Sequence, residues 1–159
     1  MRKIWNRPNQ QVWSLSTTDI EGKGNMNICT YVSAISMEPK IIMVAVYHDT
    51  QTMSNLKTSK RALLQLLSEE LAPVLQVCGR LSGAKVDKIS RLQKRHQINY
   101  LNALPYFATA AGYLELQVDQ LISFGGDHDL AICSVLSSKN ISDTKLLTTD
   151  YLRAEGLLR

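Results

Sequence analysis

The segment GGDHDLAICSV, residues 125–135, holds the densest group of side chains that could do chemistry. Asp127, His128 and Asp129 are consecutive, and an acid–histidine–acid group can bind a metal, act as a general base or form an ordinary turn. Neighbouring residues of an extended chain point to opposite sides, so these three cannot converge on one ion. The other histidines show no ligand spacing to His128. We therefore predict no metal site, and the residues alone leave the role of His128 open.

A second candidate group is the polar loop HDTQTMSN, residues 48–55. Thr50 and Thr52 are two residues apart, so in an extended loop both hydroxyl groups can point to the same side, and the Asn55 amide could add a donor. Such a loop can bind an anion, or it can be a turn with local threonine caps. We expect Thr52 or Ser54 to cap a short helix that begins near Asn55.

The net charge is +4, and basic residues are concentrated between residues 80 and 95, where only Asp87 opposes them. Such a cluster is typical of a solvated helix face, a phosphate-binding surface or a nucleic-acid surface. The chain has no recognised nucleic-acid motif, so we predict no nucleic-acid partner.

Cys29, Cys78 and Cys133 are widely separated and lack metal-ligand spacing. We expect free thiols in a reducing cytoplasm, and we do not expect Cys29 to be a redox nucleophile. No signal peptide is visible, and the longest strictly apolar run, residues 41–47, is far shorter than the roughly 20 residues of a membrane span. The sequence therefore predicts a cytoplasmic protein with no membrane partner.

With 159 residues and a 45% hydrophobic composition, the chain is predicted to form one domain, residues 1–159. Hydrophobic patterning predicts strands at 12–19, 26–37, 41–47 and on both sides of a turn at 124–129. Leucine spacing predicts a helix from 61 to about 71, interrupted at Pro73, and a second short helix over 86–95. Strands at both ends with helices between them favour a barrel with added helices.

Five segments, in this order, resemble the flavin reductase-like family, whose fold is the FMN-binding split barrel. They are RPNQQVWSLSTTDIEGKGNMNICTYVSAISMEPK, VAVYHDTQTMSN, GRLSGAKVDKISRL, GDHDLAICSV and LLTTDYLRAEGLLR. The resemblance covers nearly all of residues 4–159. It implies a mainly β fold with added helices, in which Greek-key-like antiparallel strands form a split β-barrel. It also implies that ALLQLL is a barrel strand and that a helix begins near SEELAPV.

The same resemblance implies a flavin site. It places NICTYVS at the edge of the isoalloxazine ring, the threonine loop at the flavin phosphate and the SGAKVDK lysines near a phosphate. The implied cofactor-binding residues are Asn27, Cys29, Thr30, Tyr31, Ser33, Tyr47, Thr50, Thr52, Asn55, Lys85 and Lys88. It implies that His128 lies beside the ring and helps to seat the nicotinamide, while Asp127 shapes the turn. The chain has no GxGxxG segment, but in this family NAD(P)H docks on the flavin without a Rossmann domain.

The activity that the resemblance implies is hydride transfer from NAD(P)H to FMN, in a homodimer that holds FMN at its interface. Electrons would then pass to an acceptor, which could be a protein, and FAD is also compatible with the threonine loop. One alternative is a non-catalytic FMN carrier or store. Another is a heme-handling or pyridoxamine-oxidising relative on the same barrel, in which an axial heme ligand would have to be His48, His96 or His128.

Overall fold

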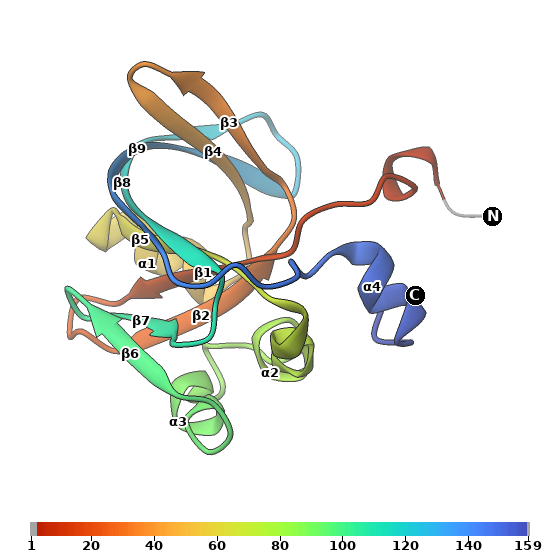
Figure 1. The fold of residues 1–159 in the computed structure, drawn as a ribbon. Coiled ribbons are helices and arrows are strands. Elements are labelled where there is room, and N and C mark those ends of the chain that lie inside the picture. Colours follow the sequence, from red (N-terminus) through yellow and green to blue (C-terminus); the bar gives the residue numbers. More distant parts are fainter. Residues whose placement is uncertain (1–2, 159) are drawn as a thin grey trace.

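The computed structural model describes residues 3–158, and an antiparallel sheet of seven strands dominates the fold (Figure 1). The strands lie in the order β2-β1-β5-β8-β9-β4-β3. Their bounds are β1 Trp13–Thr18, β2 Gly24–Cys29, β3 Val32–Met37, β4 Lys40–Tyr47, β5 Arg61–Leu66, β8 Gly112–Ser123 and β9 His128–Asn140. A separate hairpin pairs β6 (Ile98–Leu101) with β7 (Leu104–Phe107).

The sheet must curl, because its two edge strands follow each other in the chain. β2 and β3 lie at opposite edges, yet only Thr30 and Tyr31 separate them. The amide of Ala45 in β4 donates to the Tyr31 carbonyl at 2.9 Å, which fixes this link to the far edge. A flat sheet could not bring its edges together in this way, so the strands form a barrel. The barrel is split where β2 approaches β4, since these two strands are not neighbours in the hydrogen-bonded order.

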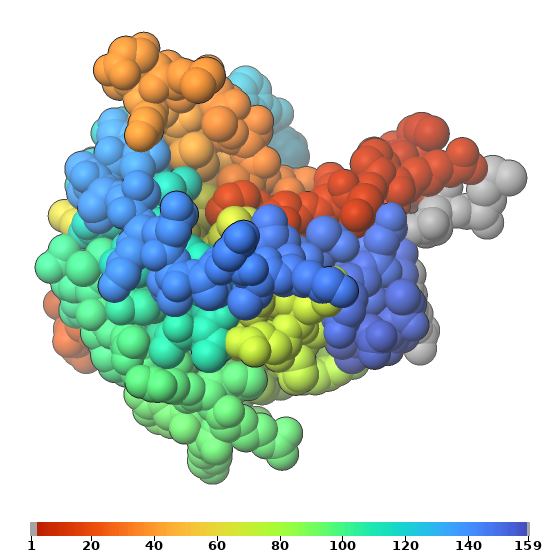
Figure 2. Space-filling view, viewed as in Figure 1, coloured from red at the N-terminus to blue at the C-terminus, as the bar shows by residue number. Residues whose placement is uncertain are grey.

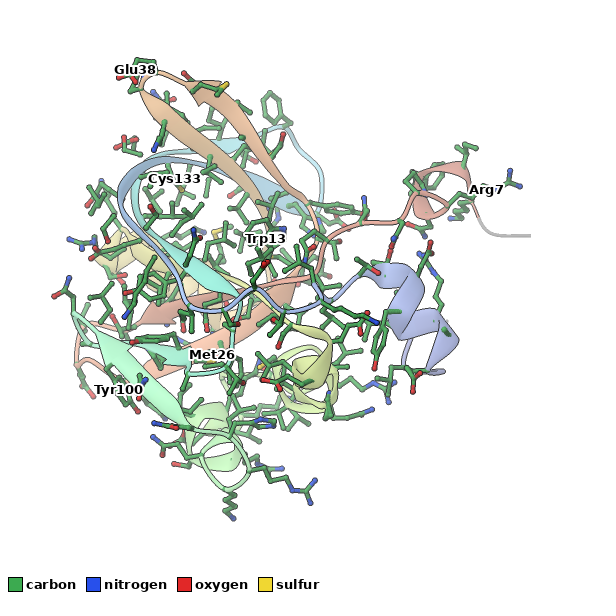
Figure 3. All side chains as sticks on the ribbon, in the orientation of Figure 1. Arg7, Trp13, Met26, Glu38, Tyr100 and Cys133 are labelled. Carbon is green, nitrogen blue, oxygen red and sulfur yellow. The ribbon has the colours of Figure 1, made fainter. Side chains whose placement is uncertain are left out.

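Helices cover one side and one end of the barrel. They are η1 Ile4–Asn6, α1 Gln51–Ser59, η2 Glu69–Val74, α2 Leu75–Cys78, α3 Lys88–Leu92 and α4 Thr149–Ala154. The β3–β4 hairpin stands clear of the rest of the molecule in the space-filling view (Figure 2). Glu38 marks the tip of this hairpin (Figure 3).

Two clusters of buried side chains hold these layers together. The cluster inside the barrel includes Leu15, Val44, Leu64, Leu116 and Ala131. The cluster between the sheet and the helices includes Met26, Leu71, Cys78, Leu92 and Phe107. Because β2 contributes Met26 to the second cluster, this strand is anchored by α2 and α3 as well as by β1 (Figure 3).

The mainly β, antiparallel fold that the sequence predicted is confirmed, and ALLQLL lies in strand β5. The helix that leucine spacing alone favoured over residues 61–71 is wrong. β5 pairs with β1 on one side and β8 on the other, and both of its faces are covered. A strand buried in this way carries a continuous apolar run, which a helical period can match by chance.

Two other expectations change in detail. The predicted strand over residues 26–37 is two strands, broken at the Thr30–Tyr31 link. The helix expected near Asn55 begins earlier, at Gln51. The β6–β7 hairpin and helix α4 were not predicted from the sequence.

Candidate functional site

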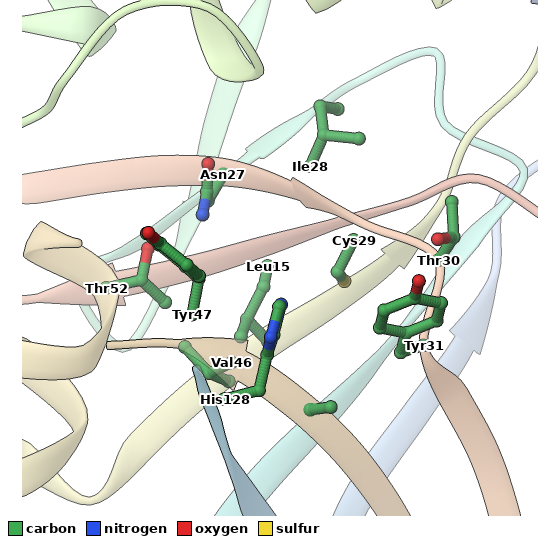
Figure 4. A pocket seen from close by; sticks show the side chains of 11 residues that line it. Leu15, Asn27, Ile28, Cys29, Thr30, Tyr31, Val46, Tyr47, Thr52 and His128 are labelled. Atoms are coloured by element: carbon green, nitrogen blue, oxygen red, sulfur yellow. The ribbon is translucent and has the colours of Figure 1, made fainter. Parts of the chain in front are cut away.

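A hollow of about 330 Å³ lies at the split in the barrel, and we term it the closure hollow. The end of β2, the link to β3, the end of β4 and the start of β9 form its walls (Figure 4). Its lining residues are Leu15, Asn27, Ile28, Cys29, Thr30, Tyr31, Ala45, Val46, Tyr47, Thr52 and His128. Among the residues predicted at the flavin ring, Ser33 alone lies outside this set: it is exposed on β3.

The backbone of β2 offers hydrogen-bonding groups along the closure hollow. The Lys88 ammonium donates to the Met26 carbonyl at 3.0 Å, so this carbonyl points away from β1. Sides alternate along a strand, and the amide and carbonyl of one residue point to the same side. The amide and carbonyl of Ile28, two residues on, therefore also point away from β1, at the hollow that Ile28 lines.

Three rings form one wall of the closure hollow. The His128 ring lies 5.3 Å from the Tyr47 ring and 5.8 Å from the Tyr31 ring, edge to face in both cases. Tyr47 and His128 are direct partners in the β4–β9 ladder, so the sheet register fixes their contact. Edge-to-face packing holds such rings in place while leaving part of each surface free.

The acid–histidine–acid segment forms two separate pairs. His128 Nδ1 lies 2.6 Å from Asp127 Oδ1, whereas Asp129 Oδ1 lies 2.7 Å from His48 Nε2. The hydrogen bond with His128 holds the pKa of the Asp127 carboxyl below its ordinary value. Within residues 3–158, no three His, Cys, Asp or Glu side chains are grouped as metal ligands. The His48–Asp129 pair was not foreseen, because the two residues are remote in sequence.

Cys29 lies in the wall of the closure hollow, but its chemistry is suppressed. Burial of the sulfur raises the pKa of the Cys29 thiol to about 12. A thiol with this pKa is almost entirely protonated near neutral pH, and the thiolate is the reactive form. Cys29 therefore contributes an apolar surface and no nucleophile.

A second hollow, of about 240 Å³, adjoins the first, and we term it the loop hollow. Residues 49–52 at the start of α1 form one wall, and residues 79–83 together with Lys88 form another. Asn27, Tyr47 and Thr52 line both hollows. The two hollows are thus parts of one continuous groove.

Thr50 and Thr52 do not lie in an extended loop, so this premise of the phosphate prediction was wrong. Thr50 is the N-cap of α1: its hydroxyl accepts from the Met53 amide at 3.1 Å and donates to the Tyr47 carbonyl at 2.8 Å. Thr52 lies in the first turn of α1, and its hydroxyl accepts from the Asn25 amide at 3.0 Å. The Thr52 proton remains available to a ligand in either hollow, whereas the Thr50 proton is already donated.

Asn55 is placed away from both hollows. Its amide nitrogen donates to Thr17 at 3.0 Å and its oxygen accepts from Gln51 at 2.8 Å, so it ties α1 to β1. Asn25, which was not predicted, holds Thr52 instead. A Cβ at position 83 would overlap the Asn25 side-chain oxygen, so only glycine lets the 79–83 wall approach so closely.

The two predicted lysines separate. Lys88 is only 3% exposed and its ammonium donates to the carbonyls of Met26 and Cys78, at 3.0 and 2.9 Å. Burial lowers the pKa of Lys88, because the charged ammonium loses its hydration when it lies beside the loop hollow. Lys85 is exposed and lines neither hollow. Arg80 and Ser82, which were not predicted as site residues, do line the loop hollow. Their segment, GRLSG, resembles part of the family, and this resemblance was the signal that could have identified them.

The curled antiparallel sheet with a groove at its split defines a split-barrel protein, and comparison with known proteins identifies its family. The model of the flavin reductase like domain family matches residues 6–153. The chain therefore belongs to the flavin reductase like domain family. This membership supports a flavin reductase-like function. A sequence comparison with curated proteins found no match.

Solved structures share the fold at low sequence identity. An NADH:FAD oxidoreductase from Streptomyces globisporus has a TM-score of 0.80 at 14% identity, over 92% of this chain and 84% of that one. An FMN-binding protein from Thermus thermophilus has a TM-score of 0.75 at 19% identity, over 88% and 75%. A candidate oxidoreductase from Sinorhizobium meliloti 1021 has a TM-score of 0.79 at 19% identity, over 91% of this chain but only 48% of that one. None of the helices in residues 3–158 is long and apolar enough to cross a membrane.

Proposed function

We propose that the protein is an NAD(P)H-dependent flavin reductase that binds FMN. The isoalloxazine ring would lie in the closure hollow and the phosphate in the loop hollow. Bound FMN supplies the redox chemistry, because its ring accepts a hydride from reduced nicotinamide. The chain supplies the binding site and the orientation of the two reactants.

The continuity of the two hollows carries this proposal. FMN is a flat, largely apolar ring joined by a short polar chain to a dianionic phosphate. The closure hollow is lined by three rings, aliphatic side chains and the polar side chains of Asn27, Thr30 and Thr52, and the loop hollow is lined by the buried Lys88. Asn27, Tyr47 and Thr52 lie where the polar chain would cross from one to the other. The residues present therefore fit both ends of the cofactor.

Each end of the groove has specific hydrogen-bonding groups. The Ile28 amide and carbonyl can bond the polar edge of the ring, as the unpaired side of β2 permits. Thr52 and Lys88 line the loop hollow, and their hydroxyl and ammonium groups can donate to phosphate oxygens. The three cysteines are unpaired, which favours a reducing compartment such as the cytoplasm.

We also propose that His128 seats the nicotinamide. Its Nδ1 is engaged by Asp127, so Nε2 is left to meet a ligand in the closure hollow. His128→Ala should retain FMN but slow its reduction by roughly 10- to 100-fold, the scale of a misplaced reactant. Anaerobic stopped-flow bleaching measures this rate, with His96→Gln as a control remote from the groove. Unchanged kinetics would make His128 a turn residue only.

A homodimer with flavin at its interface is the proposed assembly. Met37, at 86% exposure, and Ile35, at 53%, lie on β3, which is an edge strand of the sheet. Exposed apolar side chains on a projecting edge are typical of an interface between copies. Light scattering after size exclusion measures the mass. A monomer that binds FMN with full affinity would contradict this assembly.

Reconstitution tests the function as a whole. The purified protein, titrated with FMN, should turn yellow and quench flavin fluorescence, and NADH or NADPH should then bleach the bound flavin under anaerobic conditions. Tight FMN binding without bleaching would identify a carrier or store. A colourless protein that takes up no flavin, or one that gives a Soret band with heme, would overturn the proposal.

A further inference from the structure

Arg80 connects two parts of the molecule that are remote in sequence. Arg80 is exposed, and it lines both the loop hollow and a cavity beside the C-terminal segment Gly156–Leu158. The guanidinium Nη2 donates to the Leu157 carbonyl at 3.2 Å. This hydrogen bond therefore joins the C-terminal segment to a residue that lines the loop hollow.

The C-terminal segment is held firmly enough to position a side chain. Gly156 has a φ of +67°, and its amide donates to the Arg153 carbonyl at 3.0 Å. The Leu157 amide donates to the Leu152 carbonyl at 2.8 Å, which completes a Schellman motif at the end of α4. The side chains of Leu157 and Leu158 pack against the cluster between sheet and helices. The Leu157 carbonyl therefore has a fixed place.

Two basic residues, Lys88 and Arg80, line the loop hollow, and they differ in what they can offer a ligand. The Lys88 ammonium already donates to two carbonyls, and burial lowers its pKa. The Arg80 guanidinium is always charged and has five N–H groups in a planar fork that matches a phosphate. Asp49, on the opposite wall, is the one carboxylate among the residues that line the loop hollow.

We propose that Arg80 binds the flavin phosphate and that the C-terminal segment Gly156–Leu158 positions it for this role. The proposal rests on the proposed function, since it takes the loop hollow as the phosphate site. The Leu157 carbonyl accepts one N–H of Arg80 and holds the guanidinium at the groove. The remaining N–H groups then bind the phosphate at a smaller cost in conformational entropy, because the long Arg80 side chain is already restrained.

The first test compares FMN with riboflavin, which has the same ring but no phosphate. Arg80→Ala should weaken FMN binding by roughly 10- to 100-fold, the scale of hydrogen bonds to a charged group. Riboflavin affinity should not change. Lys94→Ala removes an exposed charge away from the groove and is the matched control. An equal loss for both flavins, or no loss for FMN, would overturn the assignment.

The second test asks whether the C-terminal segment acts through Arg80. A chain that ends at Gly156 should bind FMN about 3- to 10-fold more weakly, with riboflavin unaffected. In an Arg80→Ala background the same truncation should have no further effect on FMN. If the losses simply multiply, the segment does not act through Arg80.

A second variant covers the case in which truncation prevents folding. Gly156→Val keeps the full length but strains the left-handed turn that directs Leu157, and it should show the same dependence on Arg80. The outcomes also separate this proposal from the proposed function. A wild-type chain that binds neither flavin refutes the function, whereas wild-type binding with an unchanged FMN preference in Arg80→Ala refutes only the role of Arg80.

Discussion

The two hollows of the groove are built by opposite means. The closure hollow has an unpaired strand edge, three rings and a thiol whose pKa is raised by burial. We term the Asp127–His128 and His48–Asp129 pairs its rim, because they are formed by the lining residue His128 and by chain neighbours of His128 and Tyr47. The loop hollow depends on side chains that are already committed: the buried Lys88, the Thr50 cap and Thr52 held by Asn25. The closure hollow therefore offers a ligand shape and backbone geometry, whereas the loop hollow offers charge and hydroxyl groups.

The difference has a consequence for substitutions. A backbone donor survives almost any change of its side chain, so the closure hollow should tolerate replacement of most of its lining. Thr50, Thr52 and Lys88 at the loop hollow also hold parts of the fold together, so a change at one of them should affect both stability and ligand affinity. The largest effects are expected where one side chain serves both.

Lys88→Met is expected to have the largest effect. It leaves the carbonyls of Met26 and Cys78 without their donor and removes the buried charge beside the loop hollow. The free energy of unfolding should fall by roughly 2–4 kcal/mol, the cost of two unsatisfied buried groups, and FMN affinity should fall as well. Urea unfolding and FMN titration measure the two losses.

Lys85→Met is the matched control, because it changes the same residue type three positions away on the exposed surface. Its unfolding free energy should stay within about 0.5 kcal/mol of wild type. If Lys88→Met also stays within this range, the loop hollow does not depend on a buried cation and the contrast between the two hollows fails.

The two threonines offer a sharper test within one wall. Thr52→Val keeps the side-chain shape but removes both the free hydroxyl proton and the acceptor of the Asn25 amide, so stability should fall and FMN binding should weaken by about 1–2 kcal/mol. Thr50→Val removes a helix cap, so it should cost about 1 kcal/mol of stability with a smaller loss of FMN affinity. Titration and thermal unfolding of both variants give the comparison. A larger affinity loss in Thr50→Val would restore Thr50 as the phosphate ligand.

The sequence predicted the fold well where the pattern is local, and less well where contacts are remote. Strands β1, β4, β8 and β9 follow from alternation and from turns at Pro39 and residues 124–127. The leucine run of β5 could not be decided by period, because burial on both faces erases alternation. The resemblance resolved it, since it carries the order of all segments rather than one pattern.

The site was predicted in part for the same reason. The segment Asn27–Tyr31 lines the closure hollow because five consecutive residues stay together whatever the fold. Lys88 could not be recognised as buried, nor Arg80 as bound to Leu157, because both facts depend on where distant segments pack. Thr50 shows a different kind of error. The spacing of the two threonines fits both a helix cap, which is a local role, and a phosphate-binding loop, which is a functional one.

The smallest expected effect concerns the rim of the closure hollow and is read from pH dependence. Hydrogen bonds from His48 and Ser123 hold the pKa of the Asp129 carboxyl below its ordinary value. The folded state then binds this proton more weakly than the unfolded chain. The resulting stability is fully present above the unfolded pKa of about 3.9 and is lost as the pH falls through the folded value.

Asp129→Asn should therefore lose stability less steeply than wild type between about pH 5 and pH 3. Urea midpoints across this range measure the slopes, with Asp143→Asn as an exposed control outside the cluster. Equal slopes in wild type and Asp129→Asn would mean that the His48–Asp129 pair adds nothing, and that the rim, like the wall of rings behind it, is held by the sheet register alone.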